Sequence, residues 1–282
     1  MVMSERLGPS LPSSSEIRLP DAPSREVTWH DLECGAYRAD LALWRELAQL
    51  ACAGPPRSRI LDVGAGTGFA SLAMVERFAP DEIVAVDASG AMLEVFRAKL
   101  GAHPEVRVEL HNADVLHMPV ADASADAVVS SMAFHWFPNK PAALRAMARA
   151  LRPGGVMGIL TSGRGTDLEF RDVLRQIRPP VPPVWIAAFD YSQLDERELE
   201  AMLESAGLEP VDIWLERRWR RATPDAYLAR IGAVASHLSS HLDPAELEGH
   251  VARTQAAVVE ASGPRGFEFT FAKLFGVARK PG

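Results

Sequence analysis

The chain has 282 residues, of which 48% are hydrophobic and 24% charged, and this composition predicts a soluble globular protein of one large or two modest domains. The formal net charge of -7 argues against nucleic acid as a main partner, because phosphate binding needs clustered Lys and Arg. We find neither a membrane-spanning apolar run nor a signal-peptide pattern, and only two cysteines, so we expect a cytoplasmic protein without a membrane partner.

The N-terminal part divides into two segments. Residues 1–26 are rich in Ser and Pro, which predicts a disordered tail. Residues 27–54 repeat large apolar side chains, among them Tyr37, Leu41 and Trp44, at helical intervals. This spacing predicts one or two amphipathic helices before the chain is broken by Gly and Pro.

Short strands then alternate with helices. Apolar or alternating patterns predict strands at 59–63, 82–87, 106–114, 125–134 and 156–161. Helical patterns separate them at 69–78, 89–100 and 140–151. Such alternation produces βαβ units, so we expect an α/β fold with a doubly wound, mostly parallel sheet covered on both faces.

The last third of the chain follows another pattern. A helix that begins at about residue 194 and ends near Gly207 precedes a strand at 211–219, and residues 266–280 alternate apolar and polar side chains as a long strand does. Residues 223–263 have helical character and are longer than a simple connection requires. We expect 55–222 and 264–282 to form one core, and 223–263 to be a helical insertion.

A glycine loop follows the first strand in "ILDVGAGTG". Gly64, Gly66 and Gly68 are spaced G-x-G-x-G, whereas dinucleotide loops are typically G-x-G-x-x-G. Asp87 ends the second strand and is placed to accept the hydroxyls of a ribose. Asp62, before the loop, would repel a pyrophosphate but attract a cation. The pattern predicts a nucleoside ligand with a positively charged tail.

Five segments in this order resemble the motifs of the class I S-adenosylmethionine-dependent methyltransferases. They are "ILDVGAGTGFAS", "VAVDAS", "HNADVLHMPV", "DAVVSSMAFHWF" and "ALRPGGVMGIL", and they cover about residues 57–162. The segment "AFHWF" is similar to that of the small-molecule branch, which includes trans-aconitate-like, malonyl-carrier-like and type 11-like methyltransferases. The resemblance implies a seven-stranded Rossmann-like sheet with an antiparallel last strand, and N-terminal helices that act as a lid.

The resemblance also implies which residues bind S-adenosyl-L-methionine and its product S-adenosyl-L-homocysteine. Asp62, Gly64 and Gly66 would contact the methionyl part, and Asp87 the ribose. The remaining implied contacts are Ala88, Met92, Asp114 and Val115 around the adenine, Ser131 near the methionine and acceptor, and Tyr37 in the lid. Two readings stay open, because Asp114 could cap a turn and Tyr37 could pack in a core.

The acceptor is less clearly indicated. His135 follows the fourth strand, where it could act as a general base or as a structural imidazole. Trp29, Trp136, Trp185 and Tyr191 are available to wall an apolar site, which favours a flat or apolar small molecule. Arg171, Arg175 and Arg178 would suit a carboxylate, but their spacing also describes a solvated helix face.

The expected activity is direct in-line transfer of a methyl group to a small-molecule acceptor, which proximity and alignment can promote without a catalytic triad. One alternative is carboxyl O-methylation of a small organic acid. Alternatives of other classes are an NAD(P)-dependent oxidoreductase and a cofactor-binding protein without catalysis. We expect no metal, since His237 and His241 lack a third ligand, and the sequence does not predict the oligomeric state.

Overall fold

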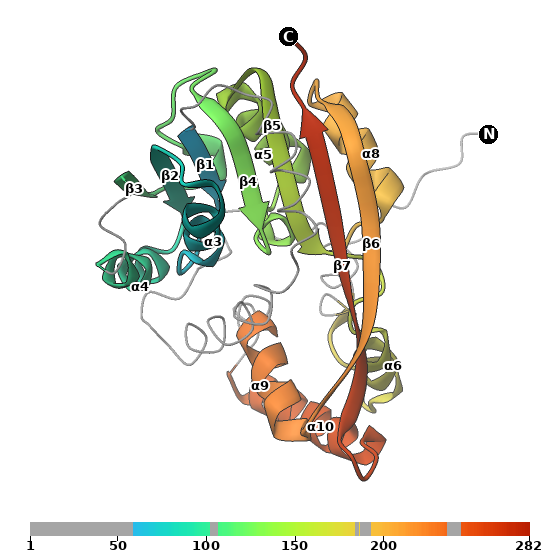
Figure 1. Ribbon diagram of the computed structural model, residues 1–282. Helices are drawn as coiled ribbons and strands as arrows, with labels where there is room; N and C mark the ends of the chain where they lie inside the picture. Colours follow the sequence, from blue (N-terminus) through green and yellow to red (C-terminus); the bar gives the residue numbers. More distant parts are fainter. Residues whose placement is uncertain (1–58, 102–106, 184–185, 187–192, 236–243) are drawn as a thin grey trace, which may run out of the picture.

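The computed structural model describes residues 59–101, 107–183, 186, 193–235 and 244–282. Its strands form one seven-stranded sheet in the order β3-β2-β1-β4-β5-β7-β6 (Figure 1). The parallel strands are β1 (Arg59–Val63), β2 (Glu82–Asp87), β3 (Arg107–Asn112), β4 (Ala125–Ser131) and β5 (Leu151–Ser162). Strands β6 (Glu209–Ala222) and β7 (Phe267–Arg279) complete the sheet, and β7 runs antiparallel to both of its neighbours, β5 and β6. The predicted α/β sheet with an antiparallel last strand is confirmed.

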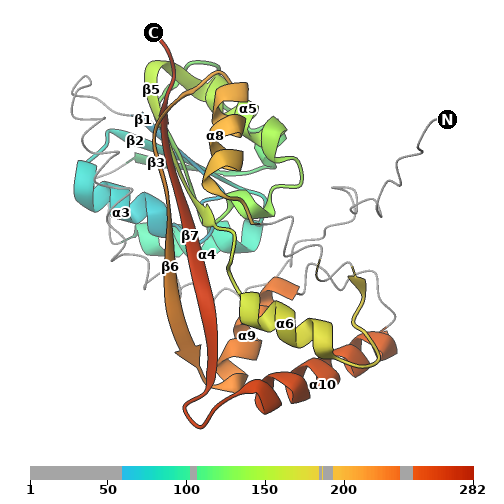
Figure 2. The ribbon, with the colours of Figure 1, turned by 90° about the vertical axis from the view of Figure 1, so that its right-hand side faces the viewer.

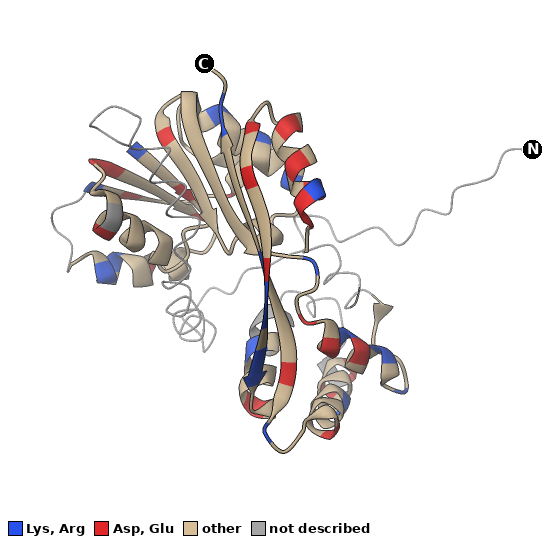
Figure 3. Ribbon diagram, turned by 45° about the vertical axis from the view of Figure 1, so that its right-hand side comes forward, with Lys and Arg blue, Asp and Glu red and all other residues tan. Residues whose placement is uncertain are grey.

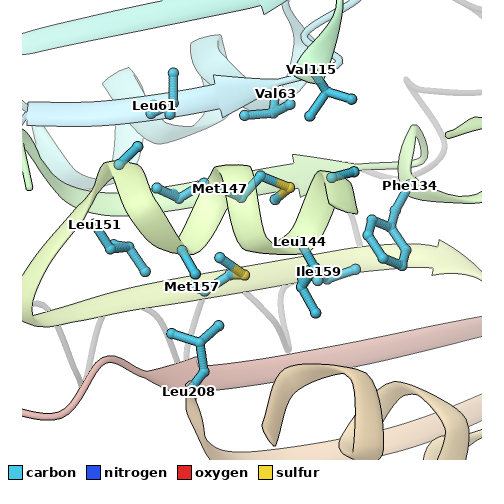
Figure 4. Packing of buried hydrophobic residues seen from close by; sticks show 14 of the residues in the cluster. Leu61, Val63, Val115, Phe134, Leu144, Met147, Leu151, Met157, Ile159 and Leu208 are labelled. Atoms are coloured by element: carbon cyan, nitrogen blue, oxygen red, sulfur yellow. The ribbon is translucent and has the colours of Figure 1, made fainter. Parts of the chain in front are cut away.

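Helices cover both faces of the sheet (Figure 2). On one face lie α3 (Phe69–Phe78) and α4 (Gly90–Leu100), whose buried side chains pack with the inner strands. On the other face lie α5 (Lys140–Ala150) and α8 (Glu196–Ser205). Figure 4 shows the second layer, where Leu144 and Met147 of α5 pack against Met157 and Ile159 of β5. Burial on both faces explains why the parallel strands are nearly continuous apolar runs.

Strands β6 and β7 extend beyond the parallel strands as a two-stranded ribbon (Figure 1). The last β5 residue, Ser162, pairs with Lys273, so residues 267–272 of β7 continue past the end of β5. The ribbon carries three helices, which we call the cap: α6 (Leu168–Gln176), α9 (Pro224–Ala235) and α10 (Pro244–Ala261). Aromatic side chains of β7 at 267, 269 and 271 form the core of the cap with the helices.

The chain after β5 covers the edge of β7 that β5 leaves open. Gly163 N–H donates to Ala272 O at 3.0 Å, and Asp167 N–H donates to Thr270 O at 2.8 Å. The Glu169 carboxylate accepts from the Thr270 backbone N–H and hydroxyl, each at 2.7 Å. These bonds satisfy backbone groups that would otherwise be left unpaired, and they fix the cap to the sheet.

Several predicted boundaries are wrong by a few residues. The strand predicted at 125–134 ends at Ser131, because Met132 has a left-handed φ of 53° and residues 134–136 form a 3-10 turn. The strand predicted at 211–219 runs over residues 209–222, since its pairing with the long β7 continues to Phe267. The predicted tail 1–26 and helices 27–54 lie outside the described residues.

None of the helices in the described ranges is long and apolar enough to cross a membrane.

Candidate functional site

The glycine loop lies where the parallel strands β1 and β2 end. Gly64, Gly66 and Gly68 all have positive φ values, of 73°, 55° and 87°. Each oxygen of Asp87 accepts one backbone N–H at 2.8 Å, from Gly66 on one side and from Ser89 on the other. Burial raises the pKa of Asp87, and these two N–H groups oppose that rise. The carboxylate therefore fixes the loop and the start of α4 in one arrangement.

Two of these glycines also allow close packing. A Cβ on Gly64 would lie 2.2 Å from the Cβ of Ala133, in the segment after β4. A Cβ on Gly68 would lie 2.1 Å from the ring of Phe96 in α4. The loop thus lies against both the neighbouring helix and the β4 segment, and neither position has room for a side chain.

Asp62 is a buried carboxylate beside the loop. Its side chain has no exposed surface, and the Ser71 hydroxyl donates to its Oδ2 at 2.6 Å. Its Oδ1 has no hydrogen-bond partner among the described residues. Burial, together with the nearby charge of Asp87, raises the pKa of Asp62 to about 7 although the Ser71 bond lowers it. A buried carboxylate oxygen without a partner fits a ligand that brings a positive charge.

The ends of β2 and β3 form the next part of the site. The amide of Asn112 donates to the carbonyls of Asp87 at 3.0 Å and Ala88 at 2.9 Å. The side chain of Asp114 accepts from Leu116 N–H at 2.8 Å, so the alternative that this residue caps a turn is observed. Asn112, which joins the two strand ends, was not a candidate from the sequence, although it stands in the "HNAD" motif.

Three further candidates lie around these strand ends. Ala88 is exposed, and Val115 is buried in the turn that Asp114 caps. Met92 is half-buried in the first turn of α4, where its N–H donates to the Ser89 hydroxyl at 3.3 Å. The structure therefore brings Ala88, Met92, Asp114 and Val115 to the same edge of the sheet as Asp87.

The segment after β4 carries the candidate base. Ser131 ends β4 half-buried, and the chain then turns through Met132 into the 3-10 turn. Nδ1 of His135 lies 3.2 Å from the hydroxyl of Thr161, a fully buried residue of β5. The ring of Trp136 lies 4.9 Å from that of His135 and is 39% exposed. Thr161 was not found from the sequence, because only the fold brings it to His135.

The other predicted contacts lie outside the described residues. They are Tyr37, expected in the lid, and Trp29, Trp185 and Tyr191, expected to wall the acceptor site. Of the four aromatic residues predicted for that wall, Trp136 is the one that the structure describes.

The three arginines at 171, 175 and 178, in and just after α6, do not form the uniform solvated face that their spacing describes. Arg171 is buried, whereas Arg175 is exposed and pairs with Asp172 at 2.9 Å. Arg178 donates to the backbone carbonyls of Arg175 and Ile177, each at 2.8 Å. The contrast arises because α6 turns one side toward the cap core.

The cap contains a buried polar cluster of Asp167, Tyr227 and Arg230. The Tyr227 hydroxyl donates to Asp167 Oδ1 at 3.0 Å, and the guanidinium of Arg230 pairs with the same oxygen. That guanidinium also lies over the rings of Tyr227 and Phe269, at 5.0 and 4.7 Å. Burial raises the pKa of Asp167, and Arg230 opposes that rise. The cluster joins the chain after β5 to α9.

Within the described ranges, no group of three or more metal-ligating side chains could hold a metal ion. His237 and His241, whose spacing could make a metal pair, lie outside those ranges.

Comparison with known proteins bears on the donor half of the site. Residues 60–155 match the family model described as a methyltransferase domain. A malonyl-[acyl-carrier protein] O-methyltransferase of Methylococcus capsulatus is 34% identical over 167 residues, which cover 56% of this chain and 60% of that protein. This chain therefore spans less than two thirds of that relative. The protein of the same name from Geobacter sulfurreducens is 29% identical over 84% of this chain and 89% of its own length.

A solved structure is similar over most of the chain. The phosphoethanolamine N-methyltransferase 2 of Haemonchus contortus, in complex with S-adenosylhomocysteine, aligns with a TM-score of 0.51 and 20% identity. The alignment covers 85% of this chain and 53% of that one, and at this identity it concerns the fold. The resemblance drawn from the five motifs is confirmed at the level of domain and fold: residues 60–155 match a methyltransferase domain, and the chain shares its fold with a solved S-adenosylhomocysteine-bound methyltransferase.

Proposed function

We propose that the protein transfers the methyl group of S-adenosyl-L-methionine to a small-molecule acceptor and releases S-adenosyl-L-homocysteine. The observation that carries the proposal is the buried Asp62 carboxylate, with Oδ1 unpartnered within the described residues, next to a G-x-G-x-G loop held by Asp87. A cationic nucleoside suits this arrangement, whereas the Asp62 carboxylate would repel the pyrophosphate of NAD. The oxidoreductase alternative is therefore disfavoured.

We assign the binding roles along the edge of the sheet. Asp62 and the backbone of Gly64 and Gly66 would hold the methionyl part, and Asp87 has lone pairs left to accept the ribose hydroxyls. The contacts proposed for the remaining parts are Ala88, Met92, Asp114 and Val115 around the adenine, Ser131 beside the methionine, and Tyr37 from the N-terminal segment.

Methyl transfer depends more on the alignment of donor and acceptor than on acid or base groups. When bound, S-adenosyl-L-methionine supplies a methyl group that is already activated by the positive charge on sulfur. The chain has to hold the acceptor in line with that methyl group and exclude water. His135 is our candidate base, and Thr161 would orient it: if Nδ1–H donates to the Thr161 hydroxyl, the neutral ring carries its acceptor lone pair on Nε2.

Two acceptor classes are in competition. The aromatic wall proposed for an apolar acceptor rests on Trp29, Trp136, Trp185 and Tyr191, of which only Trp136 is described. Relatives named malonyl-[acyl-carrier protein] O-methyltransferases support the other class, carboxyl O-methylation. We therefore favour a carboxylate acceptor, and propose that the helical insertion 223–263 contributes to its site.

Calorimetry with S-adenosylmethionine, S-adenosylhomocysteine and NAD tests the donor. We expect the first two to bind and NAD not to bind, and we expect Asp87→Ala to weaken binding at least about tenfold, or 1.4 kcal/mol. Asp126→Ala is the matched control, since Asp126 also accepts a backbone N–H, from Arg59 at 2.6 Å, but at the opposite end of the strands. Binding of NAD without binding of S-adenosylmethionine would overturn the proposal.

Incubation with labelled S-adenosylmethionine and a panel of aromatic and carboxylic metabolites tests the acceptor. Label in base-labile methyl esters would support the carboxylate class, and label on aromatic hydroxyls or carbons would support the apolar class. Cofactor binding without transfer to any panel member or to malonyl-acyl-carrier protein would favour the non-catalytic alternative.

A further inference from the structure

Strand β6 contains a run of residues that is exposed on both sides of the ribbon. Arg217, Arg218, Trp219, Arg220 and Arg221, which we call the arginine stripe, are all exposed. Successive side chains of a strand point to opposite faces, so a strand covered on one face would show alternating burial. Both faces of β6 are therefore open to solvent at the stripe, and β6 is also the outermost strand of the sheet.

The stripe lies next to the edge of the sheet that carries the proposed donor site. Glu216 pairs with Lys273, and Lys273 pairs in turn with Ser162, the last residue of β5. Arg217 therefore begins where the parallel strands end, and the stripe extends about 13 Å past that edge at about 3.3 Å per residue. Figure 3 shows this basic segment along the part of the ribbon that reaches toward the cap.

The stripe carries more positive charge than its surroundings balance. Arg218 pairs with Glu216 at 2.8 Å, and Nε of Arg221 donates to Glu268 at 3.0 Å. Arg217 and Arg220 make no ion pair within the described part of the chain. The chain as a whole has a net charge of -7, so this local excess of arginine is opposite in sign to the rest of the molecule. A partner matched to it by charge is acidic.

Trp219 indicates that the stripe does more than protect the edge strand from pairing with other chains. Charged side chains on an edge strand prevent pairing with other chains, and this explains exposed arginines. It does not explain an indole that is 71% exposed between two pairs of arginines. Trp and Arg are the residues most enriched among those that carry the binding energy of protein interfaces, which this combination matches.

A second copy of the chain does not fit the stripe. Pairing of two β6 edges would bring arginine opposite arginine, and like charges directly opposite each other destabilise paired strands. A nucleic acid fits poorly as well, because a phosphate backbone needs a longer run of clustered Lys and Arg than this stripe of five residues supplies. The observations thus favour an acidic protein.

We propose that the arginine stripe is the docking surface for an acidic carrier protein that presents the acceptor to the site. The inference rests on the proposed methyl transfer and adds to it the partner that delivers the acceptor. Relatives whose names include an acyl-carrier protein support a protein-borne acceptor. Docking on the stripe would put the carrier at the same carboxyl end of the sheet as the loop, Asp62 and His135, with β7, β5 and β4 lying between β6 and β1.

The test measures binding of an acyl-carrier protein with an excess of Asp and Glu, loaded with a malonyl group, to the full-length chain at about 0.1 M salt. We expect Arg217→Glu with Arg220→Glu to weaken binding at least tenfold, chiefly through slower association, and Trp219→Ala to weaken it about tenfold. The matched control is Arg145→Glu with Arg197→Glu, two exposed arginines of α5 and α8, which should bind as the unaltered chain does.

Three outcomes would overturn the docking proposal. They are no binding of the carrier protein at about millimolar concentration, equal weakening in the control variant, and stripe-dependent binding of a single-stranded oligonucleotide or of phosphatidylglycerol vesicles but not of the carrier. Affinity for S-adenosylmethionine is measured on the same samples. If the unaltered chain does not bind S-adenosylmethionine, the proposed function is contradicted. If the unaltered chain binds S-adenosylmethionine but not the carrier protein, the docking surface alone is contradicted.

Discussion

At the scale of single residues, Asp62 shows how a buried carboxylate can be arranged to receive a cationic ligand before that ligand binds. Its Oδ2 accepts from Ser71, while its Oδ1 has no partner in the described part of the chain, and burial raises its pKa to about 7. Near neutral pH the side chain is therefore divided between the neutral and the charged form. A cation bound beside it would favour the charged form, so binding and deprotonation are coupled.

We predict that affinity for S-adenosylmethionine falls as the pH is lowered through about 7. A raised pKa means that the carboxyl is protonated below this value and must lose its proton to face a cation, which weakens binding by up to about tenfold per pH unit. Above that pH the contribution of Asp62 is constant. Calorimetry between about pH 5.5 and pH 8.5 measures the profile.

Two variants separate Asp62 from the titration of the ligand itself. Asp62→Asn should bind more weakly at high pH and lose this part of the pH dependence. Ser71→Ala removes the bond that lowers the pKa of Asp62, so the inflection should move to higher pH. Identical profiles for the unaltered chain and Asp62→Asn would show that the carboxylate does not face the cation.

Gly64 supplies a second prediction at this scale. Gly64→Ala would bring a Cβ within 2.2 Å of Ala133 Cβ at a φ of 73°, so we expect a lower free energy of unfolding and weaker cofactor binding. Ala133→Gly should restore part of the loss by removing the contact, leaving a left-handed strain of about 1–2 kcal/mol. Urea denaturation of the unaltered chain, the two single variants and the double variant measures the coupling between the two positions. Strictly additive changes in the free energy of unfolding would contradict the predicted contact.

The donor side of the site was predictable because each residue stands at a strand end within a recognisable local pattern. Asp62, Gly64 and Asp87 needed only the apolar strands before them and the spacing between them. Thr161 and Asn112 were missed, because their partners come from other strands. The hydrogen bond from Gly66 N–H to Asp87 likewise depends on the pairing of β1 with β2, which a single sequence does not specify.

At the scale of elements, the cap depends on a buried ion pair between residues that are 63 positions apart. Asp167 begins α6 with a left-handed φ of 55°, and Arg230 belongs to α9. Both side chains are buried, at 3% and 7% exposure. The helical periodicity of 223–263 predicted the helices, but not that one of their arginines would pair with a carboxylate following β5.

We predict that Arg230→Met lowers the free energy of unfolding by about 3–5 kcal/mol, because it leaves the buried Asp167 charge without its cation. Asp167→Asn combined with Arg230→Met should lose less than Arg230→Met alone, since no buried charge remains. Chemical denaturation is the measurement.

The control for this prediction is an exposed ion pair. Asp172→Asn with Arg175→Met removes the pair on the outer side of α6 and should change the free energy of unfolding by less than about 1 kcal/mol. If Arg230→Met were as mild as this control, the buried cluster would not stabilise the cap. Raising the pH from about 4 to neutrality should enlarge the loss in Arg230→Met, as Asp167 ionises.

Strand ends were the least predictable feature at this scale. The pattern of alternating apolar residues predicted β7 over its whole length, because Phe267, Phe269 and Phe271 point to one face and pack in the core of the cap. For β6 the pattern stopped at Trp219, because the stripe has no buried face that would mark the strand. Pairing with β7, rather than its own side chains, keeps residues 217–222 extended.

At the scale of the whole molecule, the two halves of the proposed reaction are assigned to different layers. The parallel strands with α3, α4, α5 and α8 hold the donor residues, and the cap lies beyond the ends of these strands (Figure 2). The domain pattern was predictable from the first half of the chain. The acceptor was not, because the residues that would contact it come from several separate segments.

Ligand binding should stabilise the whole molecule. S-adenosylhomocysteine at about 100 times its dissociation constant should add about 2.7 kcal/mol to the free energy of unfolding. For a chain of this size that corresponds to a rise in melting temperature of about 5 °C, whereas NAD should produce no rise. A thermal melt with each ligand measures the difference, and an equal rise with NAD would contradict the proposed ligand class.

The ribbon of β6 and β7 has a consequence for how proteins of this architecture diversify. Residues 223–266 leave the ribbon at Ala222 and return to it at Phe267, two residues that pair with each other. Helices α9 and α10 are thus attached through one joint in the chain, so recombination there could exchange them between lineages without altering the glycine loop, provided that the new segment again supplies a cation for Asp167. New acceptors could then be acquired by a single genetic event while the machinery that binds the methyl donor is inherited unchanged.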